Sequence, residues 1–303
     1  MALGGAVSGF AGDSWTIGLG RVIAGVGFLL CTLYFTKTIT DWFEGREIAT
    51  AMSILVMSWP LGIAMGQVFH AWLAEMVGWQ APFQVASLYC ALAAFAVLGM
   101  YRPPDSARAR QSGAWSLTAQ EWWLVICAGT AWAVFNAGYV IYLSFGPAML
   151  VSLGASAVGA AAVISVGSWL LIGTGAVYGQ IVDRFGRRDL VITLCMIGAI
   201  VSLMLLRHPG SGLAASLLLG LVGVAPAGII MALAGEAVAP ERRAFGMGVF
   251  FTVYFAIMAV TPPIAGWLLD ITGRPDAALF AGMVMFAAVV PAVLLFRRVK
   301  GAQ

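Results

Sequence analysis

The ten residues 179–188 concentrate the groups of this chain that are best suited to ionic chemistry. They read G-Q-I-V-D-R-F-G-R-R and lie between two long apolar runs. Glycine permits a tight turn and a close approach of two backbones. A carboxylate beside several guanidinium groups can form ion pairs, and arginine also binds carboxylates or lipid phosphates. Six residues supply these properties: Gly179, Asp183, Arg184, Gly186, Arg187 and Arg188.

The pattern G-x-x-x-D-R-x-G-R-R resembles the signature loop of the major facilitator superfamily of secondary transporters. The resemblance implies a role in conformational change, without contact to the substrate. We expect a charge lock that closes the cytoplasmic side, with partners at the start of the apolar run 49–75. The alternative is a basic membrane anchor that has no gating role. The expected partners of the lock are Glu44, Arg46 and Glu47.

A second charged element, residues 20–27, reads G-R-V-I-A-G-V-G. It resembles the R-x-x-x-G-x-G element of the fourth helix in the same superfamily. Arg21 is the basic residue that we place inside an apolar span, and a charge in that position needs a partner. It could bind an anionic substrate or take part in proton coupling. Alternatively, its side chain extends to the outer membrane surface, close to Asp13.

A proline and two glycines mark a hinge in the run 49–75. Residues 58–66 read S-W-P-L-G-I-A-M-G and in part resemble the kinked fifth-helix element of some antiporters in the superfamily, with Trp59 in place of the usual glycine. Proline frees a backbone carbonyl and bends a helix. We therefore expect a hinge at Pro60, Gly62 and Gly66, which does not fix the direction of transport.

Several polar side chains fall inside the apolar runs. Asn136, Tyr139 and Tyr142 follow one another at intervals of three residues and share one helical face. Gln67 and His70 lie together in the run 49–75. Such groups either line a cavity for substrate or join helices by hydrogen bonds. The face of Asn136 is the best cavity candidate, whereas a single histidine is more often packed than functional, although His70 can titrate near neutral pH.

A further charged turn surrounds Pro240. Glu236 and Glu241 flank this proline, and Arg242 and Arg243 follow. The turn resembles the charged cytoplasmic loop before the eleventh helix of the family. We expect it to be a solvated loop.

The composition requires elements that hold these groups in a membrane. Hydrophobic residues make up 61% and charged residues 10% of the 303, against about 45–50% and about 25% in soluble domains. A spanning helix needs about 20 apolar residues, and the alternation of a barrel strand is absent. We predict an all-α polytopic membrane protein with the two-bundle fold of the family. Nine full spans are expected, at 15–38, 49–75, 81–101, 119–150, 156–181, 190–206, 211–235, 244–269 and 277–296.

The distribution of basic residues predicts the orientation. Thirteen lysines and arginines fall in one set of loops, whereas Arg207 and Arg274 fall in the other. The positive-inside rule places the first set, and the C-terminus, in the cytoplasm. Trp42-Phe43 resembles the sequence before the fifth helix of bacterial small-anion and cyanate-type porters. We therefore expect a multi-pass integral protein of a bacterial inner (plasma) membrane.

An internal repeat predicts the domain organisation. Four residues recur at an offset of 195, beside charged turns in both copies, and two parallel repeats are the architecture of this superfamily. We expect an incomplete N-terminal bundle at 1–101, a cytoplasmic linker at 102–116 and a six-helix C-terminal bundle at 117–303. The apolar stretch 2–12 is about half a span, which predicts that the first two helices and part of the third are lacking; the alternative is a short re-entrant segment. The repeated residues are Met52, Trp72, Leu73 and Gly78, with Met247, Trp267, Leu268 and Gly273.

These features together predict secondary active transport of a small solute by alternating access. No nucleotide-binding motif is present, so an ion gradient, of protons or another ion, is the expected energy source. The alternative is a transport-inactive membrane sensor, or a fragment that needs the missing helices or a partner. We expect no enzymatic activity, no cofactor, no metal and no nucleic-acid partner. Four cysteines lie in apolar runs without C-x-x-C spacing and are interpreted as small hydrophobic residues: Cys31, Cys90, Cys127 and Cys195.

Overall fold

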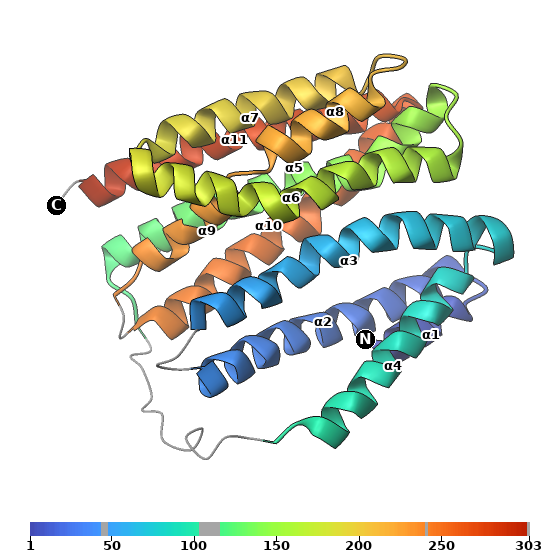
Figure 1. Ribbon diagram of the computed structural model, residues 1–303, viewed down its shortest axis with the longest axis horizontal. Helices are drawn as coiled ribbons and strands as arrows, with labels where there is room; N and C mark the ends of the chain where they lie inside the picture. The colour runs from blue at the N-terminus through green and yellow to red at the C-terminus, as the bar shows by residue number, and fades with distance from the viewer. Residues whose placement is uncertain (44–47, 103–115, 240–241, 302–303) are drawn as a thin grey trace. The chain divides into compact units, whose positions relative to one another are not determined.

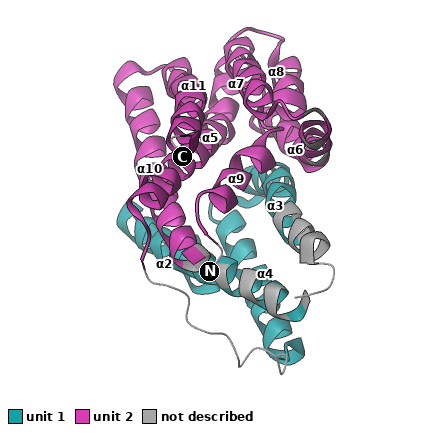
Figure 2. Ribbon diagram, turned by 90° about the vertical axis from the view of Figure 1, so that its left-hand side faces the viewer, with its two compact units in different colours: residues 1–111 teal, residues 112–303 magenta. Residues whose placement is uncertain are grey.

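The computed structural model describes residues 1–43, 48–102, 116–239 and 242–301, and the regular structure within them is helical (Figure 1). The chain divides into two compact units, residues 1–111 and 112–303, which are coloured separately in Figure 2. The division falls inside the segment 102–116, where the sequence changes from apolar to polar. Each unit is described by itself below.

The described part of unit 1 contains four helices, α1 (Ala2–Gly9), α2 (Ser14–Phe43), α3 (Ile48–Val77) and α4 (Ala81–Met100). Helix α1 packs against α2 and α4, and α3 also contacts both of them. Asp13 precedes α2 and accepts hydrogen bonds from the backbone N–H groups of Trp15 and Thr16 at 2.9 and 3.0 Å. The Thr16 hydroxyl donates to the same carboxylate and lowers the pKa of Asp13. An N-terminal carboxylate of this kind satisfies backbone donors that the helix itself leaves free.

The short helix α1 is held by close backbone contacts. A Cβ atom built on Gly4 would lie 2.4 Å from the carbonyl oxygen of Gly20 and from the nitrogen of Ala24. The Ser87 hydroxyl of α4 donates to the carbonyl oxygen of Ala2 at 2.7 Å. The segment 2–12 thus includes a helix that packs closely on its neighbours, as small residues permit in membranes.

Unit 2 is built around α5 (Ala119–Ser152), which packs against α6, α9, α10 and α11. Its core is largely the buried face of α5, including the fully buried Ala128, Ile141 and Tyr142. Helices α7 and α11 lie side by side (Figure 1). The remaining elements are α6 (Ala157–Phe185), α7 (Arg188–Leu205), α8 (Gly212–Leu218), the π-helical segment η2 (Leu219–Gly223), α9 (Ala227–Glu236), α10 (Arg243–Thr272) and α11 (Pro275–Gly301).

The prediction of an all-α polytopic membrane fold is confirmed. Among the described residues, eight helical segments are long and apolar enough to cross a membrane, and each overlaps one of the nine expected spans. The ninth expected span, 49–75, falls on the 30-residue helix α3. Large apolar side chains are exposed along these helices; Leu98 and Met100 of α4, for example, are 80% and 81% exposed. Such surfaces are stable in hydrocarbon and unfavourable in water.

The expected span 211–235 is not one continuous helix. It consists of α8, η2 and α9, with a non-helical break at residues 224–226. The carbonyl oxygen of Gly220 accepts a hydrogen bond of 2.9 Å from the Thr174 hydroxyl of α6. A Cβ atom on Gly220 would lie 2.8 Å from the carbonyl oxygen of Gly167. Irregular backbone at membrane depth is tolerated where protein covers it, which is the case here.

The helices of unit 1 match the last helices of unit 2 at the offset of 195 residues. Adding 195 to the bounds of α3 gives 243–272, the bounds of α10. The same addition places α1 at 197–204, inside α7, and α4 at 276–295, inside α11. It places α2 at 209–238, which encloses α8, η2 and α9. Helices α3 and α10 are both followed by a glycine with positive φ, Gly78 at 123° and Gly273 at 66°.

The packing of the matched helices is also the same. In unit 1, α1 contacts α2 and α4, and α3 contacts α2 and α4. In unit 2, α7 contacts the α8–η2 segment and α11, and α10 contacts α9 and α11. The same set of helix contacts therefore occurs in both units, and α5 and α6 are the further spans of unit 2.

Candidate functional site

The segment 179–188 is mostly helix. Helix α6 continues to Phe185, and α7 begins at Arg188, so Gly186 and Arg187 alone separate them. Gly186 has the left-handed backbone conformation, with φ of 75°, and its N–H donates to the carbonyl oxygen of Val182 at 2.8 Å. Helices often end at a glycine in this conformation, because residues with a side chain adopt it less readily. Gly186 thus has the turn geometry expected of it.

Gly179 lies inside α6, and a Cβ atom built there would meet no atom of the described residues within 4 Å. A close backbone approach at this glycine stays a prediction. Arg184 lies near the C-terminal end of the same helix, where a cation is favourable for the helix dipole. Asp183 lies in the last turn of α6. The expected partners Glu44, Arg46 and Glu47 lie outside the described residues.

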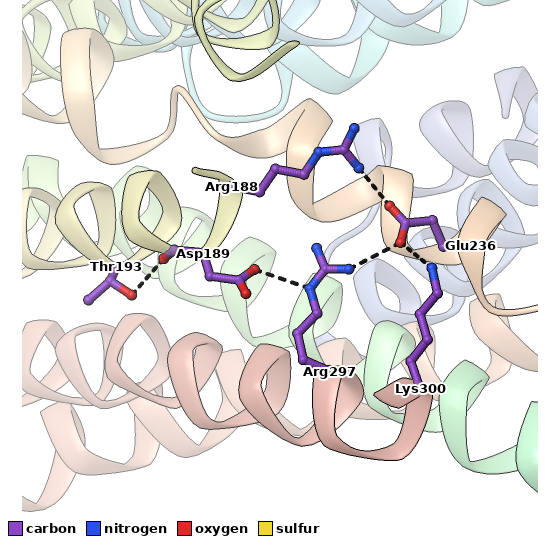
Figure 3. Close-up of polar contacts among 6 residues, drawn as sticks. All are labelled: Arg188, Asp189, Thr193, Glu236, Arg297 and Lys300. Atoms are coloured by element: carbon purple, nitrogen blue, oxygen red, sulfur yellow. Dashed lines mark hydrogen bonds and ion pairs between the residues drawn. The ribbon is translucent and has the colours of Figure 1, made fainter. Parts of the chain in front are cut away.

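Glu236, at the end of α9, binds three cations from two other helices (Figure 3). Its Oε1 atom accepts from Nη1 of Arg188 at 2.8 Å. Its Oε2 atom accepts from Nη1 of Arg297 at 3.1 Å and from Nζ of Lys300 at 2.6 Å. Arg188 is the first residue of α7, whereas Arg297 and Lys300 lie near the end of α11. A single carboxylate therefore joins three helices of unit 2.

Asp189 extends this network on the other side of Arg297 (Figure 3). Nε of Arg297 donates to Oδ1 of Asp189 at 3.2 Å, while its Nη1 reaches Glu236. Asp189 is in the first turn of α7, where the helix dipole favours a negative charge. The Arg297 side chain is 28% exposed, so water screens its charge only in part.

A second carboxylate, the buried Glu121, ties the start of α5 to the turn before α10. Glu121 and Thr118 form a reciprocal capping box at the start of α5. The Glu121 carboxylate also accepts from the backbone N–H of Ala239 at 3.1 Å and from Nη1 of Arg242 at 2.8 Å. Glu121 is only 8% exposed, and each polar contact offsets part of the cost of its burial.

The expectation of a solvated loop around Pro240 is wrong at both described ends. Glu236 is bound by three cations, and Arg242 is bound by Glu121. Sequence reasoning also missed Glu121, Asp189, Arg297 and Lys300 as partners in this network. The capping pattern T-x-x-E at Thr118–Glu121 was a visible signal for one of them. We call the end of unit 2 that carries Glu121, Glu236 and their partners the basic end.

The opposite end of unit 2 has a smaller ionic cluster. Asp276, in the first turn of α11, accepts from Nε and Nη2 of Arg274 at 3.1 and 2.8 Å. Nη2 of Arg207 donates to the same carboxylate at 3.1 Å. The two basic residues that we placed outside the membrane therefore share one acidic partner.

The polar face of α5 is buried among helices of unit 2. Tyr139 and Tyr142 are 2% and 0% exposed. The Tyr139 hydroxyl forms a hydrogen bond of 2.6 Å with Ser168 of α6. The Tyr142 hydroxyl lies 2.8 Å from Ser216 of α8 and 3.0 Å from the carbonyl oxygen of Ile164. These contacts favour the packing alternative for the two tyrosines.

Asn136 differs from the tyrosines because its contact is local. It is 1% exposed, and its amide donates to the carbonyl oxygen of Trp132 one turn earlier, at 2.8 Å. The Trp132 ring stacks on Phe135 at 5.8 Å and lies 6.5 Å from the ring of Tyr254 in α10. This region of α5 and α10 is therefore aromatic, with one amide beside it.

The remaining candidates lie in unit 1. The Arg21 guanidinium lies 5.7 Å from the centroid of the Phe83 ring, in the first turn of α4. Such a cation–π contact is favourable, and it places Arg21 close to the start of α4. Gln67 and His70 are half-buried on α3, and the His70 ring is 5.9 Å from Phe69. The hinge candidates, which are also within α3, are Pro60, Gly62 and Gly66.

The described residues contain no group of three or more histidine, cysteine or acidic side chains that could hold a metal. The features instead define a multi-pass integral membrane protein: long apolar helices, exposed apolar surfaces and ionic clusters at the helix ends. A family model described as Major Facilitator Superfamily matches residues 1–206 and 122–303. The chain belongs to this superfamily, as the signature pattern predicted.

Two curated relatives have the same family assignment in their names. Both are uncharacterized MFS-type transporters of Mycobacterium tuberculosis, from two strains, and each is 27% identical to this chain over 292 residues. The matches cover 92% of this chain and 65% of each relative. The chain thus spans about two thirds of the length of these relatives.

Proposed function

We propose that this protein takes part in secondary active transport of a small solute by alternating access. The observation that carries the proposal is the repeated helix arrangement, α1–α4 in unit 1 and α7–α11 in unit 2, at a constant offset of 195 residues. Parallel repeats of this kind rock about a site near the middle of the membrane in transporters of this architecture. The names of the relatives agree with this function.

The ionic network at the basic end supports movement of unit 2 as one body. Glu236 and Glu121 join the ends of α5, α7, α9, α10 and α11 by direct polar contacts. A body that keeps its own helix ends fixed can rock without internal deformation. Gating by Asp183 and the arginines of the signature segment, against Glu44, Arg46 and Glu47, is part of the proposal and rests on the sequence.

The charge distribution supports a cytoplasmic position of the basic end. Of the ten lysines and arginines in residues 117–303, eight fall in the segments at that end, whereas Arg207 and Arg274 at the opposite end share Asp276. Positive charge is retained on the cytoplasmic side of membrane proteins. The C-terminus, which follows Lys300, is then cytoplasmic, and a bacterial inner membrane is the proposed location.

The proposed transport function gives the polar residues inside the spans a candidate role in substrate binding or ion coupling. Arg21 is a cation for an anionic solute or for proton coupling, and Gln67 and His70 are polar groups on α3. Asn136 lies beside the aromatic group Trp132, Phe135 and Tyr254. For Tyr139 and Tyr142, the hydrogen bonds to Ser168 and Ser216 support a packing role.

A flux measurement tests the proposal. The chain is reconstituted in proteoliposomes with a pH-sensitive dye inside, and a panel of small organic and inorganic anions is added under an imposed proton gradient. Transport predicts that at least one solute accumulates above its equilibrium level and that an uncoupler abolishes the accumulation. Solute binding without flux would instead support the sensor alternative. Flux that appears only with a co-expressed partner chain would support a fragment that needs a partner.

A further inference from the structure

The turn between α6 and α7 borders an open hollow of about 340 Å³. Three arginines and one carboxylate line it. Gly186, in the left-handed conformation, forms part of its wall, and the position of its absent Cβ is open space among the described residues. The hollow therefore combines space and cationic groups at the basic end of unit 2. Its lining consists of Gly186, Arg187, Arg188, Asp189, Leu190 and Arg297.

The charges around the hollow do not cancel. Asp189 and Glu236 supply two negative charges, and both are already bound to Arg297. Arg188 and Lys300 also bind Glu236. Arg187 is exposed, and its side chain has no hydrogen bond or ion pair among the described residues. In the contacts of the described side chains, four cations thus meet two carboxylates, and Arg187 is the cation among them that binds neither carboxylate.

An apolar ridge on α7 begins in the same hollow. Leu190 lines the hollow and is 49% exposed. Leu194, Ile197 and Val201 follow at intervals of three or four residues and are 56%, 52% and 40% exposed. This spacing places them on one helical face. The ridge from Leu190 to Val201 is about 16 Å long at 1.5 Å per residue, which is about half the thickness of the hydrocarbon core.

We propose that the hollow and the ridge bind one anionic phospholipid. The phosphate of the headgroup lies in the hollow against Arg187, with Arg188 and Arg297 beside it, and one acyl chain lies along the ridge of α7. Guanidinium groups bind phosphate through paired hydrogen bonds. A free phosphate ion would use the arginines but not the ridge, and a zwitterionic lipid would use the ridge but not the excess charge.

This proposal is independent of transport and needs only the membrane location. It also gives Arg187 a role other than gating. A bound headgroup would add a negative charge beside the Glu236 network and would neutralise part of its excess positive charge.

The test measures lipid binding to the purified full chain in a mild detergent. Phosphatidylglycerol is titrated, and the bound molecules are counted by native mass spectrometry. We expect one phosphatidylglycerol to bind in preference to phosphatidylcholine. Arg187→Gln should weaken this binding about fivefold, the effect of about 1 kcal/mol for one basic residue near an anionic lipid surface. Because the Arg187 side chain is exposed and makes no polar contact among the described residues, the variant should keep the wild-type Tm.

A matched control is Arg298→Gln. Arg298 is an exposed arginine at the same end of unit 2, on α11, and it does not line the hollow. Its substitution should leave the affinity unchanged. Equal losses in the two variants would mean diffuse attraction and would overturn the proposal. Equal binding of phosphatidylcholine would also overturn it, as would competition by glycerol phosphate at concentrations similar to those of the lipid, because that result would indicate a site for free phosphate.

Discussion

Nζ of Lys300 lies 2.6 Å from Oε2 of Glu236, and this contact joins the last turn of α11 to the end of α9. The same carboxylate binds Arg188, the last arginine of the signature segment. At least one basic residue of that segment is therefore bound within unit 2 itself. If Arg188 moved during gating, its ion pair with Glu236 would have to break or move with it.

Removal of the Glu236 charge should destabilise unit 2. Glu236→Gln keeps the size of the side chain but leaves three cations without their shared anion. We expect a loss of about 1–2 kcal/mol of unfolding free energy, because Arg188 and Lys300 are 42% and 40% exposed and water screens them. The loss appears as a lower Tm in detergent, and it should shrink at high salt.

Glu75→Gln is the control for this change. Glu75 is exposed on α3 and has no ion pair among the described residues. The network would be of no consequence for stability if the two variants had the same Tm.

The buried tyrosines of α5 separate packing from substrate binding. Tyr142→Phe removes one hydroxyl that contacts Ser216 and the carbonyl oxygen of Ile164. Hydrogen bonds between membrane helices contribute about 0.6–2 kcal/mol, so the Tm should fall by a corresponding amount. Tyr139→Phe, which loses the contact to Ser168, should behave in the same way. In a flux measurement, both variants should keep the wild-type KM; a raised KM with an unchanged Tm would instead place the hydroxyl in a substrate site.

Close packing between α1 and α2 predicts opposite outcomes for two neighbouring glycines. A Cβ atom on Gly20 would lie 2.4 Å from Oγ of Ser8 and 2.7 Å from the carbonyl oxygen of Gly4. Gly20→Ala should therefore cost about 1–3 kcal/mol, as other overpacked sites do. Gly18 lies two residues earlier in the same helix, and a Cβ atom built on it would have no atom of the described residues within 4 Å. Gly18→Ala should therefore be neutral or slightly stabilising. Equal Tm values for the two variants would contradict the described packing of α1.

Asp183 tests the proposed gate. Asp183→Asn removes the charge and keeps the shape, and we expect solute flux to fall about tenfold while membrane insertion is unchanged. A tenfold change corresponds to about 1.4 kcal/mol between the two conformational states. Flux in proteoliposomes and the amount of protein in the membrane fraction are the two measurements.

Asp270→Asn is the matched substitution. Asp270 is exposed near the end of α10, with no hydrogen bond or ion pair among the described residues. Its flux should equal that of the wild type. Wild-type flux in the Asp183→Asn variant would show that the charge of Asp183 is not needed for gating.

The spans and the family were predictable because hydrophobic length is a local property. A run of about 20 apolar residues can be recognised without knowledge of its neighbours, and the turn at Gly186 followed from a glycine between two such runs. The offset of 195 residues was visible in a few identities, and the matching bounds of α3 and α10 extend it to whole elements.

The partners of the charged residues were not predictable because they are distant in sequence. Glu236 and Arg188 are separated by 48 residues, and Glu121 and Arg242 by 121. Each pair meets because the ends of different helices gather at one level, which a single sequence does not show. For Tyr139 and Tyr142, the sequence left cavity lining and helix packing open, and the choice depends on whether Ser168 and Ser216 face them.

The break at residues 224–226 has a mechanical consequence. Helix α2 runs without interruption through Phe43, whereas the corresponding stretch of unit 2 is divided into α8, η2 and α9. A continuous helix resists bending along its whole length, but a divided one yields where its hydrogen-bond ladder is interrupted. Helix α2 and the α8–η2–α9 segment therefore occupy equivalent positions in the repeat but differ in stiffness. Under the same bending force, the α8–η2–α9 segment would bend before α2.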